Sequence, residues 1–66
     1  MIAYYKLLDM LNKRNISKLE LMEMAGISRE TLAKLSKNES VTIQTIDKIC
    51  TVLKCQPGDI LEWIEK

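Results

Sequence analysis

The chain has 66 residues, which is the length of one domain, and 47% of them are hydrophobic, too large a share for a disordered segment. Ten basic and nine acidic residues leave a net charge of +1, so the chain lacks the strong basic excess that many nucleic-acid-binding domains carry. No apolar run approaches the roughly 18 residues of a membrane span, and the N-terminus lacks the pattern of a signal peptide, which predicts a cytoplasmic protein.

The first predicted element is a helix over residues 3–14. Its apolar side chains follow the i, i+3, i+4, i+7 spacing that places them on one face of a helix, at Tyr4, Leu7, Leu8 and Leu11. Residues 15–16 should form a short connection to the next helix. Residues 2–4 fit a strand as well as a helix start, so this boundary stays open.

A second helix is predicted to begin after Ser17 and to end at Ala25. Ser17 and Glu20 have the S-x-x-E spacing of a capping box, in which each side chain accepts a hydrogen bond from a free backbone N–H at the helix start. Gly26 follows the last helical residue, where a left-handed backbone is needed and glycine costs least. The sequence therefore predicts a tight turn at Gly26.

A third helix is predicted from Ser28, a favoured N-cap residue, to Lys37. Leu32 and Leu35 point to one side of this helix. The opposite side is polar and partly basic, and it carries Glu30, Ala33, Lys34 and Lys37, with Arg29 on its flank. Such a helix suits the major groove of DNA, which is wide enough to admit one helix. Asn38 is expected to cap its C-terminal end.

Thr42 is expected to cap a fourth helix that ends near Leu53. We expect its inner face to be a broad apolar stripe, formed by Ile43, Ile46, Ile49, Cys50 and Leu53. Pro57 suits the first position of a helix and Asp59 favours its positive end, which predicts a fifth helix from Pro57 to about Glu62. Trp63 and Ile64 either continue that helix or form a terminal strand.

The two cysteines do not predict a metal site, because the chain has no histidine and a structural zinc site needs four ligands. A disulfide is not expected in a cytoplasmic chain. Cys50 is interpreted as a small core residue, and Cys55 has no functional interpretation. With no acid pair, nucleophile–base pair or phosphate-binding loop, the sequence predicts neither an enzyme nor a cofactor.

The order of these helices has the spacing of a helix-turn-helix at residues 17–37, with one helix before it and two after. The chain resembles the phage-repressor and Cro-like helix-turn-helix family, also called XRE, over residues 7–61. It is most similar to small stand-alone members that share A-G-I-S-x-x-T-L-A-K-L-x-K-N-E, present here at residues 25–39, and K-I-C, present at residues 48–50. Further matching positions are Leu21, Ile46, Leu53, Asp59, Ile60 and Leu61.

The resemblance implies roles for individual residues. Arg29, Glu30 and Lys34 match base-reading positions, and Lys18 matches a residue that reaches the DNA backbone or a base edge. Phosphate-holding positions are matched by Ser17, Ser28, Lys37 and Asn38. The chemistry agrees, since Arg pairs with guanine, Glu accepts from cytosine, and Lys, Ser and Asn suit phosphate oxygens. Alternatively, Arg29 and Lys34 are ordinary surface charges and Glu30 forms an i, i+4 pair with Lys34.

We therefore expect an all-α, five-helix repressor-like domain over residues 1–66 that binds double-stranded DNA at a palindromic site as a homodimer. Residues 1–37 contain seven basic and four acidic residues, whereas residues 38–66 contain three and five, so the basic excess lies with the helix-turn-helix. The alternative is a protein-interaction module, antitoxin-like or an adaptor, which the near-neutral charge favours.

The expected dimer contact lies at the C-terminus. Trp63 and Ile64 are large and apolar but lie beyond the four-helix core, and aromatic residues are enriched at interfaces. Leu61 is expected to join them, with Tyr4 and Tyr5 from the N-terminus. The alternative is that Trp63 folds back onto the first helix of its own chain.

Overall fold

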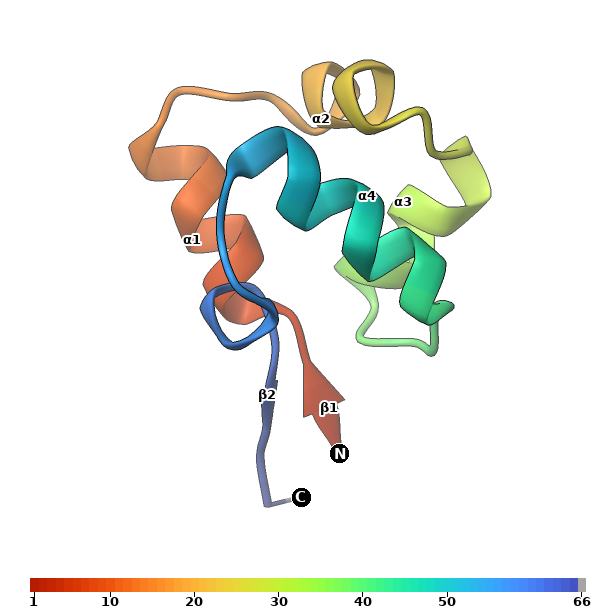
Figure 1. The fold of residues 1–66 in the computed structure, drawn as a ribbon. Helices are drawn as coiled ribbons and strands as arrows, with labels where there is room; N and C mark the ends of the chain where they lie inside the picture. Colours follow the sequence, from red (N-terminus) through yellow and green to blue (C-terminus); the bar gives the residue numbers. More distant parts are fainter. Residues whose placement is uncertain (66) are drawn as a thin grey trace.

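The computed structural model describes residues 1–65 and contains, among these, four α-helices, one 3-10 turn and two short strands (Figure 1). In chain order they are β1 (Ile2–Ala3), α1 (Tyr5–Lys13), α2 (Lys18–Ala25), α3 (Arg29–Ser36), α4 (Ile43–Leu53), the 3-10 turn η1 (Pro57–Asp59) and β2 (Glu62–Trp63). The four predicted helices are confirmed. The helix predicted over residues 3–14 is shorter at its start, because residues 2–3 form a strand instead.

Three of the four helices begin at the predicted cap residue. Ser17, Ser28 and Thr42 each have an extended backbone, and each side-chain oxygen accepts a hydrogen bond from the backbone N–H three residues later. A cap of this kind contributes about 1 kcal/mol by satisfying a backbone donor that the helix leaves free. These starts are local features, so the sequence alone predicts them.

All four helices end in the same way. One or two residues past each helix the backbone is left-handed, with φ between 53° and 67°, and these residues are Asn15, Gly26, Asn38 and Lys54. The residue that follows donates its N–H to the carbonyl five positions earlier, over distances of 2.9 to 3.2 Å. This is the Schellman motif, which satisfies carbonyls that a helix end would otherwise leave without a partner.

The predicted fifth helix is wrong. In its place η1 makes a single 3-10 turn, closed at its start by a hydrogen bond from the Gln56 N–H to Asp59 Oδ2 (2.9 Å). A helix does not continue, because Gly58 is a poor helix former and the residues after Ile60 find backbone partners in another strand. Pro57 at the first position of the turn is as predicted.

The strand β2 pairs with β1, at the other end of the chain. The two strands are antiparallel, with Ile2 opposite Trp63 and Ala3 opposite Glu62. The Ile64 N–H donates to the Met1 carbonyl (2.8 Å), and the N-terminal amine donates to the Ile64 carbonyl (2.7 Å). The terminal-strand alternative is thus confirmed at both ends, and Trp63, 69% exposed, does not pack back onto α1.

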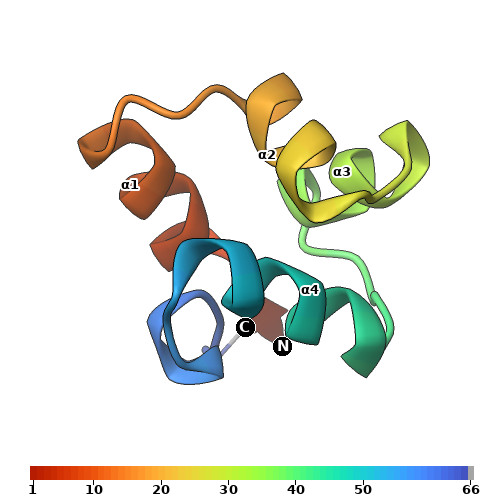
Figure 2. The same ribbon diagram turned by 45° about the horizontal axis from the view of Figure 1, so that its top comes forward.

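The core lies between the helices, where α2 packs against α4 and against α3 (Figure 2). It takes side chains from all four helices and from the segments that join them: Tyr4, Leu7, Leu11, Leu21, Ala25, Ile27, Leu35, Ile46, Ile49, Leu53 and Ile60. Each large apolar side chain buried here contributes about 1.5–3 kcal/mol relative to exposure.

The apolar stripe predicted for α4 is too broad. Ile46, Ile49 and Leu53 are buried, but Cys50 is only partly buried and Ile43 is 82% exposed. At 100° per residue, Ile43 lies about 90° from the centre of the three buried positions, so it marks the edge of the stripe. The large apolar side chain of Ile43 therefore lies on the surface of α4.

Candidate nucleic-acid interface

The turn between α2 and α3 has the predicted geometry. Gly26 has φ +67° and ψ +37°, its N–H donates to the Met22 carbonyl (2.9 Å), and the Ile27 N–H donates to the same carbonyl (3.2 Å). A Cβ built on Gly26 meets no heavy atom within 4 Å. Glycine is favoured here by its backbone freedom rather than by lack of space. Ile27 then enters the core and fixes where α3 begins.

Each of the two helices is tied at its start. The Glu20 N–H donates to Ser17 Oγ (3.0 Å) and the Ser17 N–H donates to Glu20 Oε1 (3.1 Å), so the predicted capping box is confirmed. At α3, the Thr31 N–H donates to Ser28 Oγ (3.1 Å). Both serine side chains are therefore engaged by their own helix while they remain exposed.

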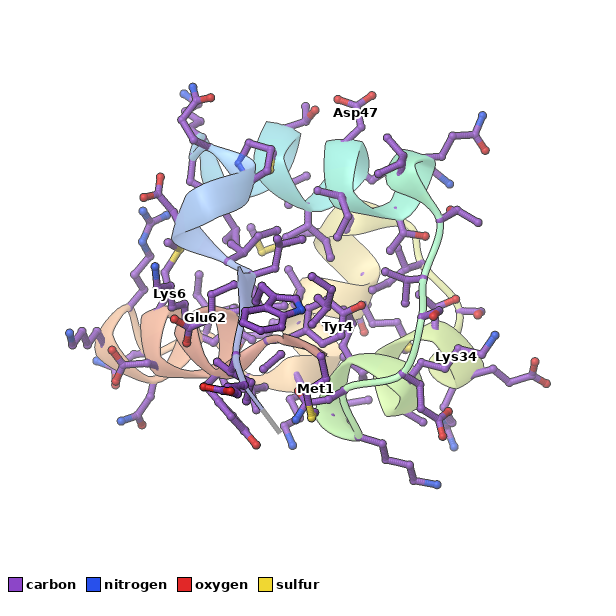
Figure 3. The ribbon with its side chains drawn as sticks, turned by 90° about the horizontal axis from the view of Figure 1, so that it is seen from below. Met1, Tyr4, Lys6, Lys34, Asp47 and Glu62 are labelled. Carbon is purple, nitrogen blue, oxygen red and sulfur yellow. The ribbon has the colours of Figure 1, made fainter. Side chains whose placement is uncertain are left out.

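One buried side chain holds α3 against the core. Leu35 is 1% exposed, and Leu32 is partly buried against the same cluster. The other side of α3 is open: Arg29, Glu30, Ala33, Lys34 and Lys37 are all exposed, and we call these five residues the reading face. Figure 3 shows Lys34 extending outward from α3 at the side of the molecule. The division into two sides follows the predicted one.

The structure brings most of the predicted site residues to the two helix starts and to the open side of α3. Seven of the eight are exposed: Ser17, Lys18, Ser28, Arg29, Glu30, Lys34 and Lys37. Within residues 1–65, the one ion pair joins Lys13 to Asp9 (3.0 Å). The alternative i, i+4 pair of Glu30 with Lys34 is therefore not formed, and both head groups remain available to a ligand.

Asn38, the eighth predicted residue, has a structural task that the sequence did not reveal. It is partly buried with φ +57°, and its Oδ1 accepts a hydrogen bond from the Tyr4 N–H (3.0 Å). Asparagine tolerates a left-handed backbone better than most residues, which explains its place at the end of α3. Its side-chain carbonyl oxygen is thus used by the fold, and only its amide N–H₂ remains as a donor for a ligand.

Tyr4 also bonds to the segment that follows α3. It is 3% exposed, and its hydroxyl donates to the Glu39 carbonyl (2.9 Å). The expectation that Tyr4 joins a dimer contact is wrong for this reason: its ring fills the core and its polar atom already has a partner. These two bonds tie the N-terminal segment to the end of α3, across more than thirty positions of sequence.

A group of hydroxyls lies beside the reading face and was not predicted from the sequence. A hollow of about 270 Å³ next to Lys34 is lined by Thr31, Ser40, Thr42 and Thr45, together with Val41. The Thr45 N–H donates to Thr42 Oγ1 (3.2 Å), and the two threonine hydroxyls lie 3.1 Å apart. The matching S-x-x-T and T-x-x-T spacings at residues 28–31 and 42–45 are the sequence signal for this grouping.

The charges of this region favour an anionic partner. Lys18, Arg29, Lys34 and Lys37 lie on the two helix starts and the reading face, against the acidic Glu20 and Glu30. The N-terminal ends of α2 and α3 add the positive ends of two helix dipoles. In the part of the chain that the structure describes, no group of three or more metal-binding side chains occurs, and no helix is long and apolar enough to cross a lipid bilayer.

Comparisons with known proteins agree with this geometry. Residues 6–66 match the family model of the Cro/C1-type helix-turn-helix DNA-binding domain. The chain is 45% identical over 56 residues to the uncharacterized HTH-type transcriptional regulator YozG of Bacillus subtilis (strain 168), covering 82% of this chain and 67% of that protein. The crystal structure of the transcriptional regulator VanUg superposes with a TM-score of 0.94 at 42% identity, over 98% of this chain and 87% of the other.

The family model covers nearly the whole chain, and the matched residues include the turn at Gly26 and both helices that flank it. The high structural similarity extends the match to the strand pair, since 98% of the chain is aligned. The chain belongs to the Cro/C1-type helix-turn-helix family of DNA-binding domains.

Proposed function

We propose that this chain is a sequence-specific transcriptional regulator, acting as a repressor, that binds a palindromic operator as a homodimer. The observation that carries the proposal is the division of α3 into a buried side at Leu35 and an open, polar side at the reading face. It acts by occupancy, as a single cytoplasmic domain over residues 1–66, and not as an enzyme.

The reading face supplies the chemistry for base recognition. Arg29 at the start of α3 pairs with the O6 and N7 atoms of guanine, and Glu30 beside it accepts from the N4 amine of cytosine. Lys34 lies one turn further along, beside the hydroxyl-lined hollow. Lys18, Lys37 and the two capping serines hold phosphates, and the Asn38 amide assists them.

The dimer contact is a second part of the proposal. Ile2 and Trp63 are opposite each other on the strand pair and are 42% and 69% exposed. A hollow of about 470 Å³ joins Ile2 to Ile43 and Leu61, so these side chains adjoin. We call Ile2, Ile43, Leu61 and Trp63 the terminal face; Ile64 is partly buried beside it, and Tyr5 is exposed on α1.

A dimer through this face is reasonable in size. A standard interface takes about 800 Å² from each partner, roughly one sixth of the 4584 Å² surface of this chain. In the view from below, Lys34 lies at the side of the molecule and Met1, at the start of the chain, lies nearer the middle (Figure 3). A two-fold axis near the terminal face then presents two reading faces to successive major grooves, about 34 Å apart.

A second candidate function has two observations in its favour. The apolar terminal face and the net charge of +1 also suit a protein-interaction module, antitoxin-like or an adaptor, in which another protein covers that face. Selection of DNA from a random pool by the purified chain separates the two functions. A palindromic consensus with half-sites about one helical turn apart supports the regulator. Recovery of unenriched sequences at low salt, where non-specific binding is strongest, rejects it.

A further inference from the structure

The C-terminal end of α4 places two thiols together. Lys54 has a left-handed backbone with φ 53° and ψ 55°, and the Cys55 N–H donates to the Cys50 carbonyl (3.1 Å). This bond folds Cys55 back over the last turn of the helix. With standard bond lengths it limits the separation of the two Cα atoms to at most about 7 Å. Disulfides span Cα separations of about 4.4–6.8 Å.

The ordinary role of these positions is an apolar contact, which commonly accompanies this kind of helix end. The matching positions at the ends of α1 and α2 are the pairs Leu11–Ile16 and Met22–Ile27. In each of those pairs one partner is buried, Leu11 at 3% and Ile27 at 8% exposure. The thiol pair differs, because both cysteines are only partly buried and both are unbonded.

Both thiols are also accessible to a small molecule. Cys50 and Cys55 line an open hollow of about 670 Å³, together with Pro57 and Leu61. Neither cysteine lines the 470 Å³ hollow beside the strand pair. A disulfide-sized reagent therefore has a route to the sulfurs that does not require the helices to separate.

We propose that Cys50 and Cys55 are a reactive dithiol that closes reversibly to a disulfide by exchange with a low-molecular-weight disulfide. Disulfides in reducing compartments are usually transient and redox-sensing, and a pair that forms within one helix end without refolding fits that use. This inference does not rest on DNA binding, since neither thiol belongs to the reading face. The hollow that exposes the thiols is also lined by Ile43 and Leu61 of the terminal face, so a dimer through that face would adjoin it.

The exchange proceeds in two balanced steps. The pKa of the Cys50 thiol is raised, first by burial and then by the nearby Cys55, Asp47 and Asp59. The raised pKa disfavours Cys50 as the first nucleophile, so Cys55, once it has lost its proton, attacks one sulfur of the external disulfide and expels one thiolate. Cys50 then loses its proton and attacks the Cys55 sulfur of the mixed disulfide, which expels the second thiolate. The protein loses two protons and two electrons, equal to two hydrogen atoms, and the external disulfide becomes two thiols.

The closed ring contains Lys54 and ties the end of α4 to the segment that enters η1. Because the folded chain already holds the thiols together, folding and disulfide formation favour each other. We expect the disulfide to be at least about tenfold more stable in the folded chain than in the chain unfolded by urea, and to raise Tm by about 5–10 °C.

The purified wild-type chain is equilibrated in buffers of defined reduced-to-oxidised glutathione ratio, with and without urea. Its free thiols are then alkylated and its mass is measured by mass spectrometry. We expect the native chain to lose two hydrogens without a glutathione adduct, at a more reducing ratio than in urea. Cys50→Ala and Cys55→Ala should each carry a glutathione adduct on the remaining thiol instead. Wild-type chain that accumulates adducts or intermolecular disulfides, or that oxidises equally well in urea, overturns the proposal.

Discussion

The reading face on α3 and the terminal face by the strand pair are both exposed, but for different physical reasons. The reading face is polar, and polar side chains on a surface need no special explanation. The terminal face exposes Trp63 at 69% and Ile43 at 82%, and exposed apolar groups of this size on one face usually mark a contact. The role of the polar face is therefore inferred from the fold that carries it, whereas the apolar face is proposed as a contact because of its exposed side chains alone.

The largest effect should come from removing the residue that supports the reading face. Leu35→Ala deletes a side chain that is 1% exposed, and we expect a loss of about 2–5 kcal/mol in the free energy of unfolding. Chemical denaturation measures this directly. Leu32→Ala, at a partly buried position of the same helix, is the matched control and should cost clearly less. Equal losses in the two variants would contradict the assignment of Leu35 as the anchor of α3.

The terminal face is tested by its most exposed aromatic residue. Trp63→Ala should weaken dimerisation by about 2 kcal/mol, because interface aromatics often dominate binding energy, and should leave the fold intact since the side chain is 69% exposed. Sedimentation at micromolar concentration, with circular dichroism to monitor folding, measures both. Tyr5→Ala, at a residue 54% exposed on α1, tests whether the contact extends to that helix, and Leu19→Ala, at a residue 55% exposed on α2, serves as the control. A folded Trp63→Ala chain that dimerises like the wild type places the contact elsewhere.

Base recognition should be sensitive to the charged residues of the reading face. We expect Arg29→Ala and Lys34→Ala each to weaken specific binding by about 1–3 kcal/mol and to relax base preference. The measurement is affinity for the selected site and for variants with single base changes.

Lys37→Ala is the matched comparison on the same helix end. It should weaken binding to all sequences alike and lower the slope of log affinity against log salt by about one, as the loss of one phosphate contact does. If all three variants lose affinity uniformly across sequences, none of these side chains reads a base.

The smallest expected effect concerns the turn that orients α3. Gly26→Val should destabilise the fold by about 1–2 kcal/mol, because a residue with a Cβ is penalised at φ +67° and a β-branched one most of all. Thermal or urea unfolding provides the value. Gly26→Asn is the control, since asparagine tolerates this backbone better and no heavy atom lies within 4 Å of the new Cβ. An unchanged melting temperature for Gly26→Val would show that the turn does not need glycine.

Features that depend on neighbouring residues could be predicted from the sequence. The caps at Ser17, Ser28 and Thr42 and the left-handed turn at Gly26 are set within a few positions, so their spacing was sufficient. The exposed reading face followed from helical periodicity. The exposure of Ile43 was also within reach, because its angle from the buried stripe follows from the same periodicity.

Features that depend on distant residues were not accessible in this way. The strand pair joins the two ends of the chain, and the extended backbone after Ile60 depends on that pairing. The bond from Tyr4 to Asn38 crosses 34 positions, so the structural task of Asn38 has no local signal, although the burial of Tyr4 follows from the apolar spacing that it shares with Leu7 and Leu11. The proximity of Cys50 and Cys55 is local in origin, but it requires Lys54, a residue without a marked preference for that backbone, to be left-handed.

The pairing of the two chain ends has a kinetic consequence. Met1 and Ile64 bond to each other across 63 positions, whereas the helix-turn-helix is made of contacts between near neighbours. Long-range pairing closes late in folding, because the chain entropy of such a closure is lost before its few bonds form. We therefore expect the strands to pair last and to separate first. Their backbone amide hydrogens should then exchange with solvent sooner than those of α2. The part of the terminal face that lies on the strand pair would then open and close repeatedly while α3 keeps its folded position.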